Sequence, residues 1–238
     1  MPAPTKGECN MKAAPPRLQD AQLAFVGRII AGVSHEFKNH LSVTKELTGL
    51  LDDLLSMDKA FPGQDRYAKI SSGIEERVKT AAEMASHLGR FAHRMDSPLA
   101  SFNVNEVVGE IVFLMRRFAR LKNVGLEFEP APELPSLHSN PSLLQLVIFS
   151  VTMPLLEHLE KQSVVRISTG KAGDRVELGL QFEKIREEGL AVTVPNIPAD
   201  ALQELRAEYS FAQPDRMSVR AVLLLAPIPA GPGDNALF

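Results

Sequence analysis

The sequence has one cysteine, Cys9, only two tyrosines and no tryptophan. A single cysteine excludes a framework of intrachain disulfides, and the shortage of tyrosine and tryptophan argues against a surface on which nucleic-acid bases stack. No run of about 18 apolar residues occurs, so the sequence predicts no membrane-spanning helix. Residues 1–16 lack the hydrophobic core of a signal peptide. These absences predict a cytoplasmic protein with neither a membrane nor a nucleic acid as partner.

The charges of the chain nearly cancel. Lysine plus arginine number 26 and aspartate plus glutamate 29, which gives a net charge of −3 and argues against a generally basic nucleic-acid binder. The chain has 238 residues, 45% of them hydrophobic, which suits one large domain or two small ones with a real core. We expect no room for a separate sensor domain.

Two segments carry apolar residues at helical spacing. The first begins near Leu18, continues through Leu54 and is predicted to form a helix of about 35 to 40 residues. It should end near the Pro62-Gly63 breaker. The second covers about 64–95, and its apolar residues are spaced close to a heptad seam. Two long helices with a short connection predict an antiparallel hairpin.

A hairpin with one apolar stripe on each helix cannot enclose a core by itself. Pairing two hairpins would give a four-helix bundle, so we predict a homodimer. The alternative is a hairpin that packs on the rest of its own chain.

The remainder of the chain mixes helices with a mostly antiparallel sheet, and the whole is therefore predicted to be α+β. Periodicity, turn residues and prolines predict the elements of this part. In order, they are a helix over 103–121, a strand over 124–129, a proline-rich loop over 130–141, a helix over 142–159 with a kink or break at Pro154, strands over 164–169, 175–182 and 191–194, a short helix over 200–208, and a strand over 219–225.

The segment 27–41, GRIIAGVSHEFKNHL, is the most informative for chemistry. His35 lies about 160° around the helix from the centre of the apolar stripe, so it should face outward. Ala31 and Gly32, one turn earlier, are small and should leave the ring accessible to a docking partner. A neutral imidazole can accept a phosphoryl group near pH 7. The residues expected on the same outward face are Arg28, Asn39, Ser42 and Glu46.

Neighbours of His35 suggest supporting roles. Glu36 could hydrogen-bond a ring nitrogen and accept a proton. Lys38 and Arg28 could neutralise phosphoryl charge. Asn39, one turn on, could orient a water molecule or the phosphoryl group.

The string AGVSHEFKNHL resembles the phosphoacceptor box of two-component histidine kinases, in which His-Glu-x-Lys/Arg-Asn follows a small-residue turn. His40 stands where the family usually has proline. The resemblance implies that His35 is phosphorylated, that Glu36 acts as a base and that Asn39 helps to dephosphorylate a response regulator. It also implies that Lys38 is part of the catalytic box. The partner it implies is the receiver domain of a response regulator. We expect the docking face to comprise Arg28, Ala31, Gly32, Ser42 and Glu46.

Residues 98–228 resemble the family's α/β-sandwich ATPase domain in hydrophobic pattern but lack its nucleotide boxes. The Mg²⁺-binding asparagine should fall at about Met153, and a thioether does not suit Mg²⁺. The segment FEKIREEGLAV, after the strand over 175–182, has no Asp-x-Gly-x-Gly box, and the only late Gly-x-Gly is 231–233. We therefore expect no ATP binding, no cofactor and no metal site, with Mg²⁺ supplied by the response regulator. Residues 191–213 would be a shortened remnant of the nucleotide lid.

Other candidates are weaker. No histidine pair has metal-ligand spacing with a Cys or carboxylate cluster. A small basic group is expected to be a solvated helix face. It consists of Arg116, Arg117, Arg120 and Lys122.

The expected organisation is a disordered tail over 1–16, a dimerisation and phosphotransfer hairpin over 17–97, a degenerate ATPase-like domain over 98–228 and a flexible tail over 229–238. The predicted function is a histidine phosphotransferase of a phosphorelay, which exchanges phosphoryl groups between His35 and response-regulator aspartates without ATP. The alternatives are a divergent but active histidine kinase, and a non-catalytic scaffold or phosphatase that binds a response regulator.

Overall fold

The computed structural model describes residues 17–57, 64–186, 195–215 and 217–226. Four expectations lie outside these residues: the tails over 1–16 and 229–238, the breaker at 61–63 and the strand over 191–194. The segment expected to hold the Asp-x-Gly-x-Gly box lies outside them in part, and Gly231–Gly233 lies outside them altogether.

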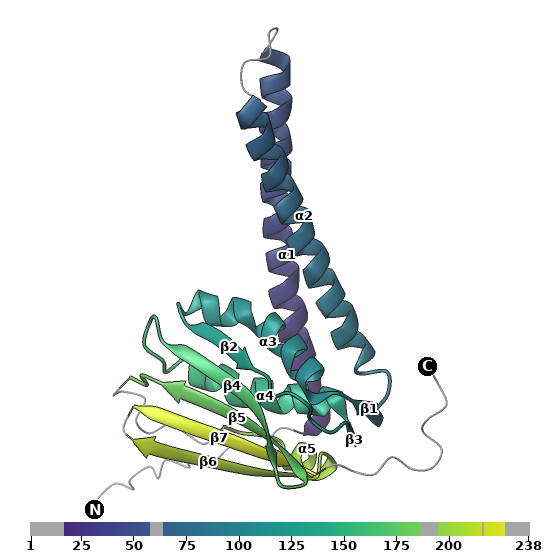
Figure 1. Ribbon diagram of the computed structural model, residues 1–238, viewed down its shortest axis with the longest axis vertical. Coiled ribbons are helices and arrows are strands. Elements are labelled where there is room, and N and C mark those ends of the chain that lie inside the picture. The colour runs from purple at the N-terminus through teal and green to yellow at the C-terminus, as the bar shows by residue number, and fades with distance from the viewer. Residues whose placement is uncertain (1–16, 58–63, 187–194, 216, 227–238) are drawn as a thin grey trace, which may run out of the picture.

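Two long helices form the predicted antiparallel hairpin. They are α1 (Leu18–Met57) and α2 (Gln64–His93), and the hairpin rises from the rest of the molecule like a stalk (Figure 1). Phe25, Ile29 and Val33 are buried on one face of α1, as the spacing of four residues requires. Among the described residues, no helix is long and apolar enough to cross a membrane.

The rest of the chain combines helices and strands, which confirms the α+β class. A five-stranded sheet has the strand order β2-β4-β5-β7-β6, in which the pair β2 and β4 is parallel and the other pairs are antiparallel. Strands β1 and β3 form a separate antiparallel pair. The elements are β1 (Ala100–Phe102), α3 (Val104–Leu121), β2 (Gly125–Glu129), β3 (Leu137–Ser139), α4 (Pro141–Leu156), β4 (Val164–Ala172), β5 (Arg175–Glu183), α5 (Ala199–Glu204), β6 (Ala207–Asp215) and β7 (Ser218–Leu225).

Side-chain caps define where α3 and α4 begin. The side chain of Asn103 accepts a hydrogen bond from the backbone of Asn105, and that of Asn140 accepts one from the backbone of Leu143. Pro141 then occupies the first turn of α4, where a missing N–H is harmless. Pro154 lies inside the last turn of α4, so the helix passes through it and ends at Leu156, earlier than expected.

Strand β6 corrects the reading of the C-terminal region. The expected helix over 200–208 is only α5. The residues after it form the edge strand β6, which pairs with β7 in antiparallel fashion. Residues 207–213, expected to belong to a lid remnant, are instead part of the main sheet. Residues of β6 are at most half-buried, because an edge strand has a neighbour on one side only. The short strands β1 and β3 were also not expected.

The lower part of the hairpin shares a core with α3 and α4. Phe25 of α1 packs against Phe91 of α2 and Phe149 of α4, with ring centroids 5.3 and 4.9 Å away. Helices α3 and α4 lie between the hairpin and the sheet (Figure 1). The hairpin therefore packs partly on its own chain, the alternative left open by the sequence, while its upper part projects beyond the sheet.

The face of α2 that meets α1 differs from the expected heptad seam. The expected seam includes Ile70, Val78, Ala81 and, just after α2, Met95. Ile70 and Ala81 are buried, but Val78 is 54% and Met95 37% exposed. Met84 and Phe91, outside the expected seam, are buried instead. The structure thus leaves apolar side chains on the outer surface of the hairpin.

A buried ion pair connects α2, α3 and α4. Glu110 of α3 is only 4% exposed and accepts a hydrogen bond of 2.9 Å from Arg94, which directly follows α2. The amide of Gln145 on α4 donates to the same carboxylate at 3.2 Å. The hydrogen bond with Glu110 raises the pKa of Arg94 above its usual value, so the guanidinium stays charged.

Candidate functional site

His35 is exposed on α1, as predicted. Its Nδ1 lies 3.3 Å from the side-chain nitrogen of Asn39, one turn further along the helix. In this arrangement the amide donates to Nδ1. If the amide turned over, its oxygen would accept a hydrogen bond from Nδ1–H, which keeps the proton on Nδ1 and leaves the lone pair of Nε2 free. Asn39 is therefore placed to select the tautomer of the imidazole.

The side chain of Glu36 contacts α3. Its carboxylate accepts a hydrogen bond from Arg120, and the two form an ion pair. The side chain of Glu36 is 18% exposed and that of Arg120 66% exposed. The expected contact of Glu36 with the imidazole is thus replaced by this ion pair, because the carboxylate lies on the flank of α1 that packs towards α3.

A cavity of about 270 Å³ lies beside the histidine. Two guanidinium groups of α3 border it, those of Arg117 and Arg120, together with the apolar side chain of Leu121, which is 67% exposed. Guanidinium groups present several donors to a phosphoryl group. The full lining consists of His35, Glu36, Asn39, Arg117, Arg120 and Leu121.

The basic group on α3 is therefore more than a solvated helix face. Arg117 and Arg120 lie at the His35 cavity, whereas Lys122 pairs with Glu157 and Arg116 lies over the ring of Phe113. Sequence reasoning missed this because Arg120 and Glu36 are 84 residues apart. The unusual run of arginines on one helix was the only signal.

Two of the expected docking residues occupy other surroundings. Gly32 is buried, and a Cβ built on it would lie 2.8 Å from Cζ of Phe118. The expected open position of Gly32 is thus corrected: its small size admits α3 rather than a partner. Arg28 lies over the ring of Phe149, 5.4 Å from its centroid, and so contacts α4. Arg28 is nevertheless exposed. Besides His35 and Asn39, the other exposed residues of the expected site are Ala31, Lys38, Ser42 and Glu46.

The described residues provide no obvious metal centre. No group of three or more His, Cys, Asp or Glu side chains in this part of the chain could hold a metal ion. Met153, at the position expected for the family's Mg²⁺ ligand, is 6% exposed and belongs to the apolar core.

Sensor histidine kinases are the relatives found by sequence. The chain is 23% identical over 194 residues to the sensor histidine kinase ZraS of Klebsiella oxytoca, a match that covers 82% of this chain and 39% of the relative. It is 22% identical over 156 residues to ZraS of Salmonella typhimurium, with 65% and 32% covered. The chain thus spans about two fifths of the length of the first relative. No family model matches.

Solved histidine kinase structures were also found. The catalytic domain of histidine kinase ThkA has a TM-score of 0.45 at 14% identity and covers 55% of this chain and 96% of its own. Histidine kinase AdeS of Acinetobacter baumannii has a TM-score of 0.44 at 9% identity, with 81% and 97% covered. The sequence relatives, independently of these structures, confirm that the chain resembles two-component histidine kinases.

Proposed function

We propose that the chain is a histidine phosphotransferase of two-component signalling, which exchanges phosphoryl groups between His35 and aspartates of response-regulator receiver domains. One observation carries the proposal. His35 is exposed, contacts Asn39 through a ring nitrogen and borders a cavity with two arginines. This combines a nucleophile, a group that can set its tautomer and cations suited to a phosphoryl group.

The transfer would begin with attack of the Nε2 lone pair of His35 on the phosphorus of an aspartyl phosphate. The N–P bond forms as the bond from phosphorus to the carboxylate oxygen breaks, and the carboxylate leaves with the electron pair. An Asn39 oxygen turned towards Nδ1 would hold the proton there during attack. Arg117 and Arg120 would neutralise charge on the moving phosphoryl group. The reverse reaction follows the same path to a second regulator.

Glu36 would act mainly by positioning Arg120. Its carboxylate is already engaged by that guanidinium, so it would serve as a base only after the ion pair opened. The exposed Leu121 beside the cavity would add an apolar contact for the receiver domain. With Ala31, Ser42 and Glu46 it extends the proposed docking surface across α1 and α3.

The proposal that ATP is not used rests on the missing nucleotide boxes. In the helix aligned with the family's asparagine-bearing helix, Met153 offers a thioether in place of an oxygen ligand, which a hard Mg²⁺ ion does not favour. The divalent ion needed for transfer would therefore belong to the regulator.

We also propose that the active form is a homodimer. The upper hairpin carries exposed apolar side chains on both helices, among them Leu41 at 56% and Val78 at 54%. A second hairpin would cover them in a four-helix bundle.

Phosphotransfer profiling tests the proposed function. Purified protein is mixed with response regulators that carry labelled aspartyl phosphate, and label on the protein is followed, with an ATP lane alongside. We expect label on the wild type, none on His35→Ala and normal labelling of His93→Ala, whose imidazole is exposed on α2. Mg-ATP alone should give no label. Strong labelling by Mg-ATP would contradict the proposal.

The second candidate is a divergent but active histidine kinase, which the sequence relatives favour because they are sensor histidine kinases. It predicts a rise in melting temperature with Mg-ATP and ATP-dependent label on His35. A scaffold would instead bind a regulator with equal affinity in wild type and His35→Ala and transfer nothing.

A further inference from the structure

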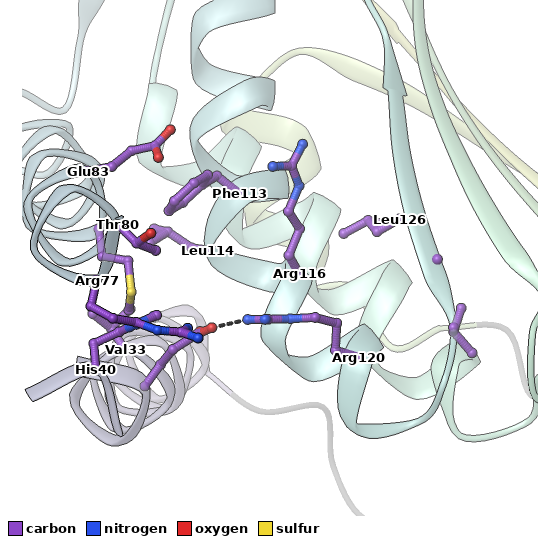
Figure 2. Close-up of a pocket in the computed structure, with 14 residues that line it drawn as sticks. Val33, His40, Arg77, Thr80, Glu83, Phe113, Leu114, Arg116, Arg120 and Leu126 are labelled. Carbon is purple, nitrogen blue, oxygen red and sulfur yellow. Dashed lines mark hydrogen bonds and ion pairs between the residues drawn. The ribbon is translucent and has the colours of Figure 1, made fainter. Parts of the chain in front are cut away.

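A second and larger cavity lies on the other side of the Glu36–Arg120 ion pair. It has a volume of about 500 Å³ and lies between the hairpin, α3 and the start of β2. It shares only Glu36 and Arg120 with the His35 cavity. Figure 2 shows Arg77 of α2 and Arg120 of α3 pointing towards one another across this space, with Arg116 above Arg120 in this view. Its volume falls in the range of small-molecule sites.

The cavity has an excess of positive charge. Three arginines line it, against the carboxylates of Glu36 and Glu83. In the part of the chain that the structure describes, neither Arg77 nor Arg116 forms an ion pair with a carboxylate. Arg77 is only partly exposed, so its charge is held near the cavity without a partner of its own. Guanidinium groups that form no ion pair can bind the carboxylate, sulfonate or phosphate group of a ligand.

The charge of Arg77 also affects the pKa of His40. Burial and the nearby charge of Arg77 lower its pKa below the usual value. The other charged residues that line the cavity are Arg116, Arg120, Glu36 and Glu83. His40 is therefore neutral near pH 7, where it can donate one hydrogen bond and accept another.

The remaining wall of the cavity is apolar. Met84 is 4% and Leu114 5% exposed, and the ring of Phe113 and the side chain of Leu126 are also in the lining. Figure 2 shows Phe113 and Leu126 on opposite sides of the Arg116 side chain. One molecule in the cavity would thus meet guanidinium groups and an apolar surface.

We propose that this cavity binds a small amphipathic organic anion. Its acidic group would contact Arg77 and Arg116, and its apolar body would lie on Phe113, Met84 and Leu126. Both kinds of contact are needed, since the charged groups fix orientation and the apolar wall supplies most of the buried surface.

Binding here would compete with Glu36 for Arg120. Because the Glu36–Arg120 ion pair forms the wall between the two cavities, an anion that attracts Arg120 would release the Glu36 carboxylate next to His35. The effect on phosphotransfer rests on the proposed function, whereas binding itself does not. A binding assay therefore tests the cavity even if the chain transfers no phosphoryl group.

Two fluorescent probes of nearly the same shape test the cavity. Anilinonaphthalene sulfonate carries an acidic group on an apolar body, and N-phenylnaphthylamine has the same body without the acid. We expect the sulfonate to bind at least about tenfold more tightly than the amine, and Arg77→Gln to weaken it about tenfold, as loss of a charge-assisted contact predicts. Glu36→Gln should strengthen sulfonate binding, because a competitor for Arg120 is removed.

Arg220→Gln is the matched control, since Arg220 lies on β7 and pairs with Glu177. The affinity of this variant for the sulfonate should equal that of the wild type. Arg116→Gln serves as a second variant if Arg77→Gln melts early by circular dichroism. Equal affinity for the two probes, or wild-type affinity in a folded Arg77→Gln or Arg116→Gln protein, would overturn the proposal.

Discussion

At the scale of single residues, two glycines of α1 differ in what surrounds them. Gly32 lies against the ring of Phe118, and a Cβ there would come within 2.8 Å of Cζ, whereas a Cβ on Gly27 would meet nothing within 4 Å. Glycine inside a helix is less favourable than alanine by about 1 kcal/mol. The two positions should therefore respond differently to the same substitution.

Gly27→Ala is expected to raise the free energy of unfolding by up to about 1 kcal/mol, because only the helix propensity changes. Gly32→Ala should give no such gain, since the added methyl group displaces Phe118 from its edge-to-face contact with Phe149. Urea denaturation of both variants measures the difference. An equal rise in the free energy of unfolding of the two variants would show that the packing of α3 on α1 does not require a glycine at position 32.

Tyr209 makes a prediction about alkaline pH. Its hydroxyl is buried and has no hydrogen-bond partner among the described residues, and burial raises its pKa to about 12. An unfolded tyrosine has a pKa of about 10. The folded state thus holds the proton more tightly than the unfolded state. The contribution of this difference to the free energy of unfolding is complete below pH about 10 and is lost as the pH rises towards 12.

Tyr209→Phe should reduce this loss of stability at alkaline pH. Between pH 9 and 12 the wild type is expected to lose free energy of unfolding more steeply than the variant, and at pH 7 the variant should be at least as stable, since it removes an unpaired buried hydroxyl. Urea denaturation at a series of pH values provides the comparison. Parallel curves would mean that Tyr209 ionises equally in both states.

At the scale of elements, the buried Glu110 joins the end of the hairpin to α3 and α4. Its carboxylate binds Arg94, which directly follows α2, and the amide of Gln145 on α4. Such a group stabilises a particular arrangement only while its partners remain, because a buried charge without a partner is costly. Glu106, one turn earlier on α3, offers a comparison: it lies 3.6 Å from Arg94 but is 66% exposed.

Glu110→Ala is expected to lower the free energy of unfolding by about 3 kcal/mol, because Arg94 and Gln145 lose the partner that satisfies them. Glu106→Ala, which breaks an exposed pair with the same arginine, should lower it by less than about 1 kcal/mol. Chemical denaturation of the two variants tests the contrast. Similar small losses would indicate that water replaces Glu110 freely.

The elements also show what the sequence could and could not predict. Helices α1 and α3 followed from long apolar periodicity, and β7 from a short apolar run. Strand β6 was missed because an edge strand with no fully buried residue leaves little hydrophobic pattern. His35 was found because its motif is local, whereas Arg120 was missed because only the tertiary fold brings α3 to α1.

At the scale of the whole molecule, the hairpin has two different environments. Its lower part belongs to the core shared with α3 and α4, and its upper part projects from the body (Figure 1). The projecting part keeps Leu41 and Val78 more than half exposed. A monomer would leave this apolar surface in water, at a free-energy cost that association removes.

The protein is therefore expected to sediment at twice the mass of one chain. Replacing Leu41 or Val78 with glutamate should shift it towards the monomer, since each would place a charge in the bundle interior. Lys45→Glu, at an exposed position on α1, serves as a charge control. Analytical ultracentrifugation over a range of concentrations measures the shift. A wild-type monomer at all concentrations would contradict the dimer.

The ion pair between Glu36 and Arg120 joins residues 84 positions apart in the chain. If a receiver domain docks at His35, it meets a discontinuous epitope, part from α1 and part from α3. A peptide that copied α1 alone would present the histidine but lack half of the recognised surface. Substitutions confined to α3 could consequently change partner choice while the histidine motif stayed intact.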